Sequence, residues 1–507
     1  MYINGQRGFV RRIGRVSIAL VLLVATGAGA VFAAGQPEAE NTALSVWHYE
    51  AENSAMGTAW AEAMRQFQEQ HPDAALTFEQ KGFEQIRQTA SMVLNSAEAP
   101  DVMEYNKGNA TAGLLSSQGL LTDLTSVAQE RGWDSILGDS LAVTSRYQDG
   151  SMGAGNWYGV TNYGEYVMVY YNQDMFDEYG LQVPETLAEF ESVMEAFVAE
   201  GVTPIAFSGA EYPAQHLFYE LVLSQADQSF IDAYQLGQGE VDFHGNEFTF
   251  AANTMVDWVE RGFISEDSVS MKAEDMGLAF IGGQNPIMVS GSWWYGRLMN
   301  EIDTFDWDIF LFPGNQFHPG SGGNLWVVPA NSTNKELAYD FIDITLQPDV
   351  QTILGNAGGI PVNANLDEID DPQIRSLIAG FDEIVQSNGL AFYPDWPVPG
   401  YYDVLVANVQ QLIGRSASPD EVDFCPTVIF LMDAPGKRQE LHDMAMRIAT
   451  VGYHVLLPNL YYRKSKNFQM NWSEEGRKEM FEMTKHLSIS LVMNDVKALL
   501  SHTDNQA

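Results

Sequence analysis

Apolar residues recur at two different spacings along the first third of the chain, and the alternation predicts strands followed by helices. In "GTAWAEAMRQFQEQHPD" the residues Trp60, Met64 and Phe67 fall on one face of a helix. The pattern also predicts a second helix, "FEQIRQTASMVLNS", and three strands, "TALSVWHYE", "AALTFEQKG" and "APDVMEYN". Strands that alternate with helices predict a parallel sheet covered by helices, which is the α/β class.

Further along, residues 166–201 predict a buried strand, a loop and a helix. The strand is "YVMVYYN", and Pro184 lies in the loop that follows it. Thr186 has a carboxylate three residues later, at Glu189, and this spacing is typical of a helix N-terminus. No repeat at the period of a solenoid is visible, so the pattern favours a globular α/β protein.

Charge divides the chain near Asp423. The whole sequence has 26 Lys and Arg against 67 Asp and Glu, a formal charge of −41. Residues 1–423 hold 16 basic and 58 acidic side chains, whereas residues 424–507 hold 10 and 9. Such an asymmetry indicates two segments of different origin. The acidic segment repels polyanions, which excludes nucleic acid and anionic lipid as its partners.

The N-terminus is typical of an export signal. Arg7, Arg11, Arg12 and Arg15 precede the apolar run "VSIALVLLVATGAGAVFAA", and small residues close it. The pattern predicts a signal peptide over residues 1–34 and a periplasmic or extracellular protein, with an uncleaved anchor as the alternative. No cysteine follows the run, so we expect no lipoprotein, and a single cysteine allows no internal disulfide.

Loops rich in aromatic and polar residues follow the predicted strands, where α/β sheets bind their ligands. These loops are "WHYEAEN", "EYNKGN", "SGAEYPAQH", "SGSWWYG", "PGSGGNLW" and "FYPDWPVPGYY". Aromatic faces stack on the apolar faces of a pyranose, and carboxylates and amides bind its hydroxyls. The six loops together predict a sugar-binding site, although a single Trp or Tyr in such a loop is as often part of the core or rim.

Motifs for catalysis and metal binding are absent from the sequence, which contains no G-x-S-x-G, H-E-x-x-H, Walker or G-x-G-x-x-G pattern. We therefore expect no catalytic residues, no metal site and no cofactor. Asp101 and Glu104 could be drawn as the acid and base of a glycosidase. With 58 carboxylates in residues 1–423, however, proximity in sequence does not identify such a pair.

Six segments resemble the extracellular solute-binding proteins of carbohydrate ABC transporters. They are "APDVMEYNKGNATAGLLSSQGLLTDL", "YGVTNYGEYVMVYYNQDMF", "GVTPIAFSG", "FIGGQNPIMVSGSWWYG", "GGNLWVVPANSTNKELAYDFIDITLQ" and "NAGGIPV". Their order and spacing match from about Leu44 to Val422. The resemblance implies two α/β lobes joined by hinge strands, the fold of periplasmic binding proteins, which close on a sugar.

The resemblance also implies a domain plan for residues 41–422. Lobe one would comprise about 41–160 and 312–346, and lobe two about 161–311 and 347–422. The partners would be a mono- or oligosaccharide and the subunits of an ABC permease, and we expect a monomer. A surface adhesin that uses the same site without a permease is a weaker alternative.

Matched one position at a time, the sugar contacts of the family fall on nine residues: Trp47, Glu50, Tyr105, Asn106, Tyr212, Trp293, Asn324, Trp396 and Tyr401. Trp47 and Glu50 are expected in the loop after the first strand. Trp293, in "SGSWW", matches the most regular stacking tryptophan of the group. Asn324 follows Gly322 and Gly323, which are expected to let the backbone approach the ligand.

The pattern of that family breaks after Glu421. "TVIFLM" and "YHVLLP" predict strands, and "SEEGRKEMFEMTKHLSISLVMNDVKALLSH" predicts one long amphipathic helix. "RQELHDMAMRIATVG" predicts a helix with Leu441, Met444, Ala445 and Ile448 on one face. Residues 424–507 resemble the first part of a dienelactone hydrolase, an α/β-hydrolase, most clearly in "VIFLMDAPGKRQELHDMAMRIATVGYHVLLPNLYYR".

This fragment is expected to be inactive. Asp433 falls where that family often has a Glu near its active site, but the nucleophile would follow the next strand, beyond Ala507. Cys425 precedes the first strand and is therefore not the nucleophile, and His442 and His454 are expected at the surface or in a core. A gene fusion, a sequence-assembly join or a decayed appendage would explain the tail. Action as a hydrolase is the alternative to sugar binding.

Overall fold

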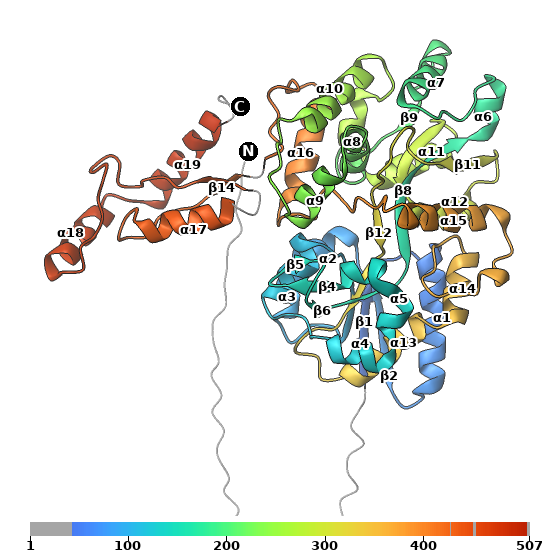
Figure 1. Ribbon diagram of the computed structural model, residues 1–507, viewed down its shortest axis with the longest axis horizontal. Coiled ribbons are helices and arrows are strands. Elements are labelled where there is room, and N and C mark those ends of the chain that lie inside the picture. The colour runs from blue at the N-terminus through green and yellow to red at the C-terminus, as the bar shows by residue number, and fades with distance from the viewer. Residues whose placement is uncertain (1–42, 426, 450–452, 504–507) are drawn as a thin grey trace, which may run out of the picture. The chain divides into compact units, whose positions relative to one another are not determined.

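The computed structural model describes residues 43–425, 427–449 and 453–503 (Figure 1). The signal peptide predicted over residues 1–34 lies outside the described residues. Within the described ranges, no helix combines the length and apolar character that crossing a bilayer requires.

The first sheet has the strand order β2-β1-β3-β13-β7. Its strands, in that order, are Ala75–Gln80, Ala43–His48, Val102–Tyr105, Leu325–Val327 and Val160–Thr161. β1 is parallel to β2 and β3, whereas β13 is antiparallel to β3 and β7. The parallel arrangement predicted for the first three strands is therefore confirmed, and β13 makes the sheet as a whole mixed. The reason is that β13 comes from much later in the chain and enters the sheet from the opposite direction.

The second sheet has the order β11-β8-β10-β9, and β12 also pairs with β8. These strands are Trp307–Phe310, Gly164–Asn172, Ile287–Gly291, Ile205–Ala206 and, for β12, Gly320–Gly322. β8 is antiparallel to β10, β11 and β12, and only β9 and β10 are parallel among these described strands. All nine residues of β8 are buried, because the strand is covered on both faces.

Helices surround each sheet (Figure 1). The first sheet and the helices beside it are here called lobe one. These helices are α1 (Ala55–Gln70), α2 (Phe83–Leu94), α3 (Leu114–Ser117), α4 (Thr125–Arg131), α5 (Trp133–Ala142), α13 (Lys335–Thr345) and α14 (Pro348–Asn356). Three short strands, β4 (Arg146–Gln148), β5 (Ser151–Met152) and β6 (Asn156–Trp157), form a separate small sheet.

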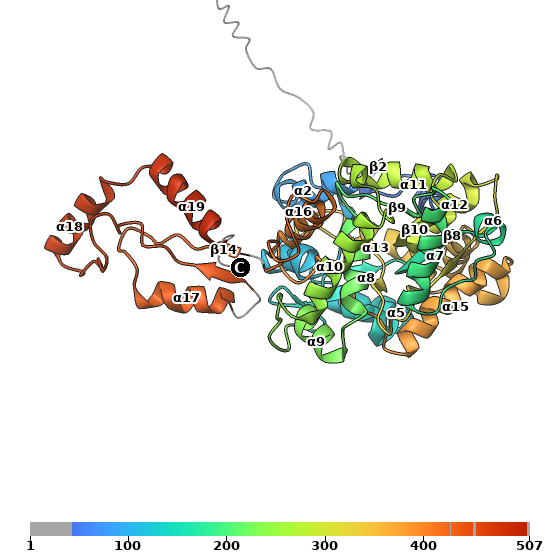
Figure 2. The same cartoon turned by 90° about the horizontal axis from the view of Figure 1, so that it is seen from above.

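The helices of lobe two accompany the second sheet. They are α6 (Gln173–Glu178), α7 (Leu187–Ala199), α8 (Ala214–Leu223), α9 (Gln228–Leu236), α10 (Asn246–Glu260), α11 (Ala273–Ile281), α12 (Tyr295–Glu301), α15 (Pro372–Gln386) and α16 (Tyr401–Ile413). Figure 2 shows α8, α10 and α16 lying together, as their mutual packing requires.

Helix α14 differs from the expected division of the chain at residue 346. Val350 and Leu354 are buried in the same core as Trp60 of α1 and Phe341 of α13. Lobe one therefore extends through α14, about ten residues further than expected, because the apolar face of this helix packs on α1.

The predicted start of α7 is confirmed in atomic detail. The Thr186 hydroxyl accepts the backbone N–H of Glu189 at 3.2 Å, and the Glu189 carboxylate accepts the N–H of Thr186 at 3.2 Å. This reciprocal pair satisfies two N–H groups that the first turn of a helix leaves without a partner.

Three passages of the chain cross between the lobes, and the last of them runs from α14 to α15, where Ile360 bridges to Gly164. The other two pass from one sheet to the other. Residues 160–172 leave the first sheet at β7 and enter the second as β8, and residues 320–327 return from β12 to β13. β12 pairs with the start of β8, from Gly164 to Tyr166. The crossing passages therefore lie side by side and join the two lobes.

The core of lobe two continues past α16 to Phe424. The Phe424 ring stacks on Phe218 of α8 with 4.5 Å between centroids, and Val422 is buried in the same cluster. The Asn408 amide donates to the Asp423 carbonyl at 2.6 Å. These contacts fix the end of the lobe just before the tail begins.

The tail forms a β-α-β unit followed by two helices. β14 (Thr427–Ile429) is parallel to β15 (His454–Leu456), with α17 (Gln439–Ala449) between them in sequence. The single long helix expected after them is instead two helices, α18 (Glu474–Thr484) and α19 (Ile489–Thr503). The Ser488 hydroxyl accepts the Leu491 N–H at 3.2 Å, which starts a new helix there.

Apolar cover in the tail is incomplete. Its buried cluster contains Met432, Leu441, Leu460, Tyr461 and Phe468. Of the expected apolar face of α17, Leu441 is buried but Met444 is 49% exposed. Among the described residues, five large hydrophobic side chains of residues 43–423 are exposed, against eight in the tail. The eight are Leu431, Met444, Met446, Tyr462, Trp472, Phe481, Ile489 and Met493. Such a surface favours aggregation.

These contacts predict where the tail can be removed. A chain ending at Cys425 should be as stable as the full chain and more soluble. A chain ending at Asp420 should lose about 3–5 kcal/mol of unfolding free energy, because it lacks the buried Phe424 ring. Denaturant unfolding and light scattering measure the two effects.

A matched pair of substitutions in the full chain serves as control. Phe424→Ala should reproduce the loss seen on truncation at Asp420, whereas Phe481→Ala, at a 60% exposed ring of the tail, should leave lobe stability unchanged. Equal stability of the chains ending at Asp420 and Cys425 would show that Phe424 does not complete the lobe.

Candidate functional site

A cavity of about 330 Å³ lies where loops from the two sheets converge. All six of the predicted loops contribute to its lining, through residues that include Glu50, Asn106, Tyr212, Trp293, Asn324 and Trp396. The prediction that these loops meet at one place is therefore confirmed. The same six residues are the ones, among the nine predicted contacts, that the structure brings together.

Trp47 does not line the cavity. It lies within β1 rather than in the loop after it, and side chains alternate between the two faces of a strand. Val46 and His48 are buried, so Trp47 lies on the opposite face. There the Lys81 ammonium lies 4.4 Å from the centroid of its ring. The expected place of Trp47 in a loop was wrong.

Tyr105 and Tyr401 also lie outside the lining, because both belong to the core. Tyr105 is the last residue of β3, and Tyr401 opens α16 with only 1% of its surface exposed. The Tyr401 ring packs edge-on against Tyr234 and Phe243, at 6.3 and 6.1 Å between centroids. Both tyrosines therefore serve packing at the ends of their elements.

The glycines before Asn324 make room for protein side chains. A Cβ atom on Gly323 would lie 2.6 Å from the ring of Tyr163, and one on Gly322 would lie 2.7 Å from Thr161. The structure therefore gives these glycines a packing role, and the expected approach of the backbone to a ligand stays a prediction. Their effect on the site is indirect, because the Tyr163 hydroxyl accepts the Asn324 amide at 2.8 Å and so orients it.

Another glycine positions one of the cavity tryptophans. Gly108 has a φ angle of 102°, which favours glycine, and a Cβ there would lie 2.5 Å from Cγ of Trp396. The chain after β3 can therefore pass directly against the Trp396 ring, and the Ala110 N–H donates to the Trp396 carbonyl at 3.0 Å.

Aromatic rings form a continuous wall of the cavity. The centroid of Trp293 lies 6.3 Å from Tyr212, 5.8 Å from His216 and 6.1 Å from Tyr393. Tyr393 in turn lies 5.2 Å from Trp396. Burial lowers the pKa of His216 to about 3, so its ring is neutral at pH 7. The wall therefore offers uncharged, flat surfaces.

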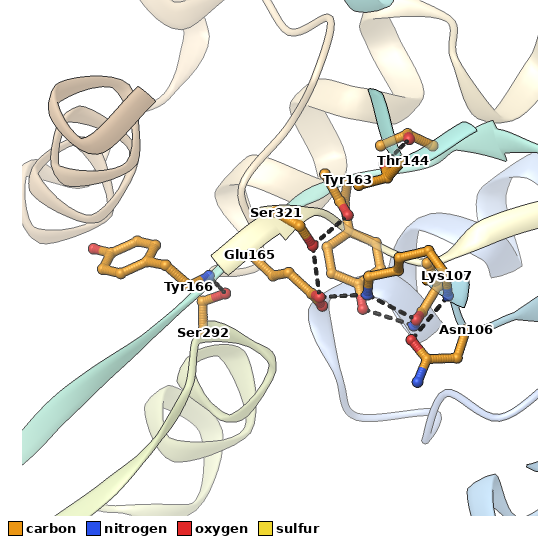
Figure 3. Close-up of polar contacts among 12 residues, drawn as sticks. Asn106, Lys107, Thr144, Tyr163, Glu165, Tyr166, Ser292 and Ser321 are labelled. Carbon is orange, nitrogen blue, oxygen red and sulfur yellow. Dashed lines mark hydrogen bonds and ion pairs between the residues drawn. The ribbon is translucent and has the colours of Figure 1, made fainter. Parts of the chain in front are cut away.

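Lys107 places a buried positive charge in the cavity. Its ammonium pairs with the Glu165 carboxylate and donates to the side-chain oxygen Oδ1 of Asn324 at 3.3 Å. The Ser321 hydroxyl donates to the same carboxylate at 3.3 Å. Figure 3 shows the facing Lys107 and Glu165 side chains with Ser321 and Tyr163 beside them. Because Glu165 lies on β8 and Ser321 on β12, the ion pair connects lobe one to both crossing strands.

Further carboxylates lie near this pair. Glu104 accepts the Asn162 amide at 3.1 Å and the Tyr49 N–H at 3.4 Å, and burial raises its pKa to about 7. Glu50 accepts the Ser54 hydroxyl at 3.3 Å, and burial, together with the charge of Glu104, raises its pKa well above the usual range. Burial likewise raises the pKa of Asp395 to about 6.

Six buried polar atoms of lining residues have no partner within the described part of the chain. They are the acceptor Oε1 of Gln215, Nδ1 of His216, the hydroxyls of Tyr49 and Tyr393, and the indole N–H groups of Trp293 and Trp294. A buried polar atom without a hydrogen bond is destabilising, so such atoms indicate a bound polar molecule or water. The aromatic rings of the wall can stack on the flat apolar faces of a bound molecule, and the polar atoms of the lining can form hydrogen bonds with the groups at its edges.

Sequence reasoning missed Lys107, Glu165 and His216. The sequence could have singled out Lys107, because it is the only Lys or Arg in the six loops. Glu165 had none, since it is one of 67 acidic residues and sits within a strand otherwise made of buried residues. His216 is the last residue of the third loop, four positions after Tyr212.

Comparison with known proteins gives two matches along the chain. The pattern of the family "Bacterial extracellular solute-binding protein" matches residues 50–352, and that of the dienelactone hydrolase family matches residues 412–507. A relative of the tail in Synechocystis is 25% identical over 92 residues, which are 37% of its length.

The relatives of the lobes share little sequence identity with this chain. A "Probable sugar-binding periplasmic protein" of Rhizobium meliloti is 26% identical over 215 residues, which are 40% of this chain and 47% of the relative. A "Multiple sugar-binding protein" of Streptococcus mutans is 25% identical over 34% of this chain and 43% of its own length. The chain thus spans less than half the length of these curated relatives.

A solved structure from work on xylan utilization by Caldanaerobius polysaccharolyticus has the same fold. Its TM-score is 0.66 at 20% identity, and the match covers 75% of this chain and 97% of that one. The family match over residues 50–352 agrees with the two lobes and the paired crossing strands of the structure. The chain belongs to the family of bacterial extracellular solute-binding proteins.

Proposed function

We propose that this protein is a non-catalytic receptor that binds a sugar between its two lobes and delivers it to an ABC import permease. The observation that carries the proposal is the aromatic wall around Trp293, which faces buried carboxylates in one cavity. Rings stack on the C–H faces of a pyranose, and carboxylates accept hydrogen bonds from its hydroxyls. The names of the two curated relatives, both sugar-binding, support the same ligand class.

The cavity favours a small ligand. Its volume of about 330 Å³ is at the lower end of the roughly 300–1,000 Å³ of small-molecule sites. A mono- or disaccharide fits this volume better than a long oligosaccharide. The export-like sequence of residues 1–34 supports action outside the cytoplasm, and we propose that the receptor works there as a monomer.

Hydrolysis by the tail is the second candidate function, favoured by the family match over residues 412–507. Its described residues argue against it. Asp433 is paired with Arg438, and His442 and His454 are both exposed. Burial and the charge of Asp423 raise the pKa of the Cys425 thiol, which disfavours the reactive thiolate.

A panel of neutral mono- and disaccharides tests the receptor function. The right sugar should raise the melting temperature, since a ligand that binds only the folded state stabilises it by mass action. It should also change tryptophan emission, because Trp293, Trp294 and Trp396 line the cavity. Calorimetry and fluorescence give the two readouts. A panel that changed neither would contradict sugar binding.

Trp293→Ala should weaken binding of that sugar by about 1–3 kcal/mol, the value of a lost aromatic contact. Trp47→Ala is the matched control, because it removes the same side chain outside the cavity and should leave affinity unchanged. Isothermal titration measures both. An equal loss in the two variants would remove Trp293 from the ligand site.

Esterase and dienelactone assays test the tail. We expect no turnover above the uncatalysed rate, and Cys425→Ala should not alter that result. The sugar affinity of the same preparation shows that the protein is folded. Turnover that the substitution abolishes would overturn the non-catalytic assignment.

A further inference from the structure

Buried negative charge exceeds buried positive charge around the cavity. The acidic side chains concerned are Glu50, Glu104, Glu165 and Asp395, of which the first three are less than 9% exposed. Lys107 is buried among them and pairs with Glu165. One ammonium cannot compensate four carboxylates, so this region has an excess of negative charge or of bound protons.

The other cation of the lining is already engaged. Arg297 forms two hydrogen bonds to the Glu274 carboxylate, at 2.7 and 2.8 Å, and pairs with Glu301 at 2.9 Å. Within the described residues, neither Glu50 nor Asp395 has a Lys, Arg or His nitrogen at ion-pair distance. Two lining carboxylates therefore lack a cation.

Some uncharged groups of the cavity also attract positive charge, although the unpartnered indole N–H groups of Trp293 and Trp294 are donors. Gln215 offers an unpartnered carbonyl oxygen in the lining. The faces of aromatic rings carry partial negative charge and attract cations. The Lys107 ammonium already lies 5.4 Å from the Trp396 ring and 5.5 Å from the Tyr393 ring. Acceptor atoms and ring faces thus add to the potential of the carboxylates.

We propose that the sugar bound here is an amino sugar, whose protonated amine forms an ion pair with Glu50. This inference rests on the proposed function, because it names the ligand class of the same cavity. Glu50 lines the cavity and holds a single described hydrogen bond, from Ser54, so its carboxylate has capacity for a ligand donor. The carboxylates around the cavity would repel the carboxylate of an acidic sugar.

Proton release accompanies this binding. The groups that face Glu50 electrostatically are Glu104, Glu165, Lys107, Tyr49, Tyr163 and Tyr212. Because Glu50 is buried beside Glu104, its protonated form is favoured in the free cavity. An ammonium from the ligand stabilises the carboxylate form instead, and the carboxyl proton passes to the buffer.

The test compares matched monosaccharides by isothermal titration at pH 6, where a sugar amine is already protonated. The gluco and galacto series are each used as neutral hexose, hexosamine, N-acetylhexosamine and hexuronate. The hexosamine of one series should bind about 10–100-fold more tightly than its neutral parent, the range expected for a hydrogen bond to a charged group. The hexuronate should bind most weakly.

Titration in buffers of different ionisation enthalpy supplies a second readout on the unmodified protein. We expect proton release when the hexosamine binds and none when the neutral hexose binds. Glu50→Gln should bring the affinities of hexosamine and hexose close together. Glu69→Gln removes an acidic group at the exposed end of α1 and should leave their ratio unchanged.

Each outcome separates this inference from the function on which it rests. Tighter binding of the hexosamine with proton release supports the amino-sugar assignment. Equal or tighter binding of the neutral hexose would overturn it and leave the sugar receptor intact, as would tightest binding of the hexuronate. Failure of all eight sugars to bind would count against both.

Discussion

The buried ion pair between Lys107 and Glu165 is the interaction on which the arrangement of the site depends. Its two side chains are only 3% and 4% exposed, so each charge needs the other. Removing one partner of such a pair destabilises a protein strongly, because the remaining charge is left buried and uncompensated. Here the partners come from the loop after β3 and from β8, and Ser321 on β12 donates to the same carboxylate. The pair therefore fixes the crossing strands relative to the first sheet, and with them the cavity.

Local features of the fold were predictable because neighbouring residues determine them. The capping pair of Thr186 and Glu189 is complete within four residues, and the apolar face of α1 follows from its spacing. The six loops were predictable for a related reason, since loops at strand ends converge in α/β folds whatever their sequence. The direction of β13 was not predictable, because it depends on a crossing between lobes that no local pattern records.

The site residues divide along the same line. Trp293 and Trp396 line the cavity, as the family resemblance implied, whereas the same matching placed Trp47 and Tyr401 there and the structure does not. Composition cannot tell which face of β1 a side chain occupies, nor that α16 begins at Tyr401 and turns that ring into the core. Lys107 and Glu165 are 58 positions apart, so their pairing is a property of the fold alone.

Completeness of apolar cover distinguishes the lobes from the tail. Phe424 closes the core of lobe two by stacking on Phe218, and just beyond it β14 has β15 as its partner among the described strands. A two-stranded sheet is marginal by itself, and α17 leaves Met444 and Met446 exposed. A catalytic constellation requires side chains held rigidly by a surrounding core. The side chains around the Lys107–Glu165 pair are held in this way, whereas the described part of the tail leaves much of its apolar surface exposed.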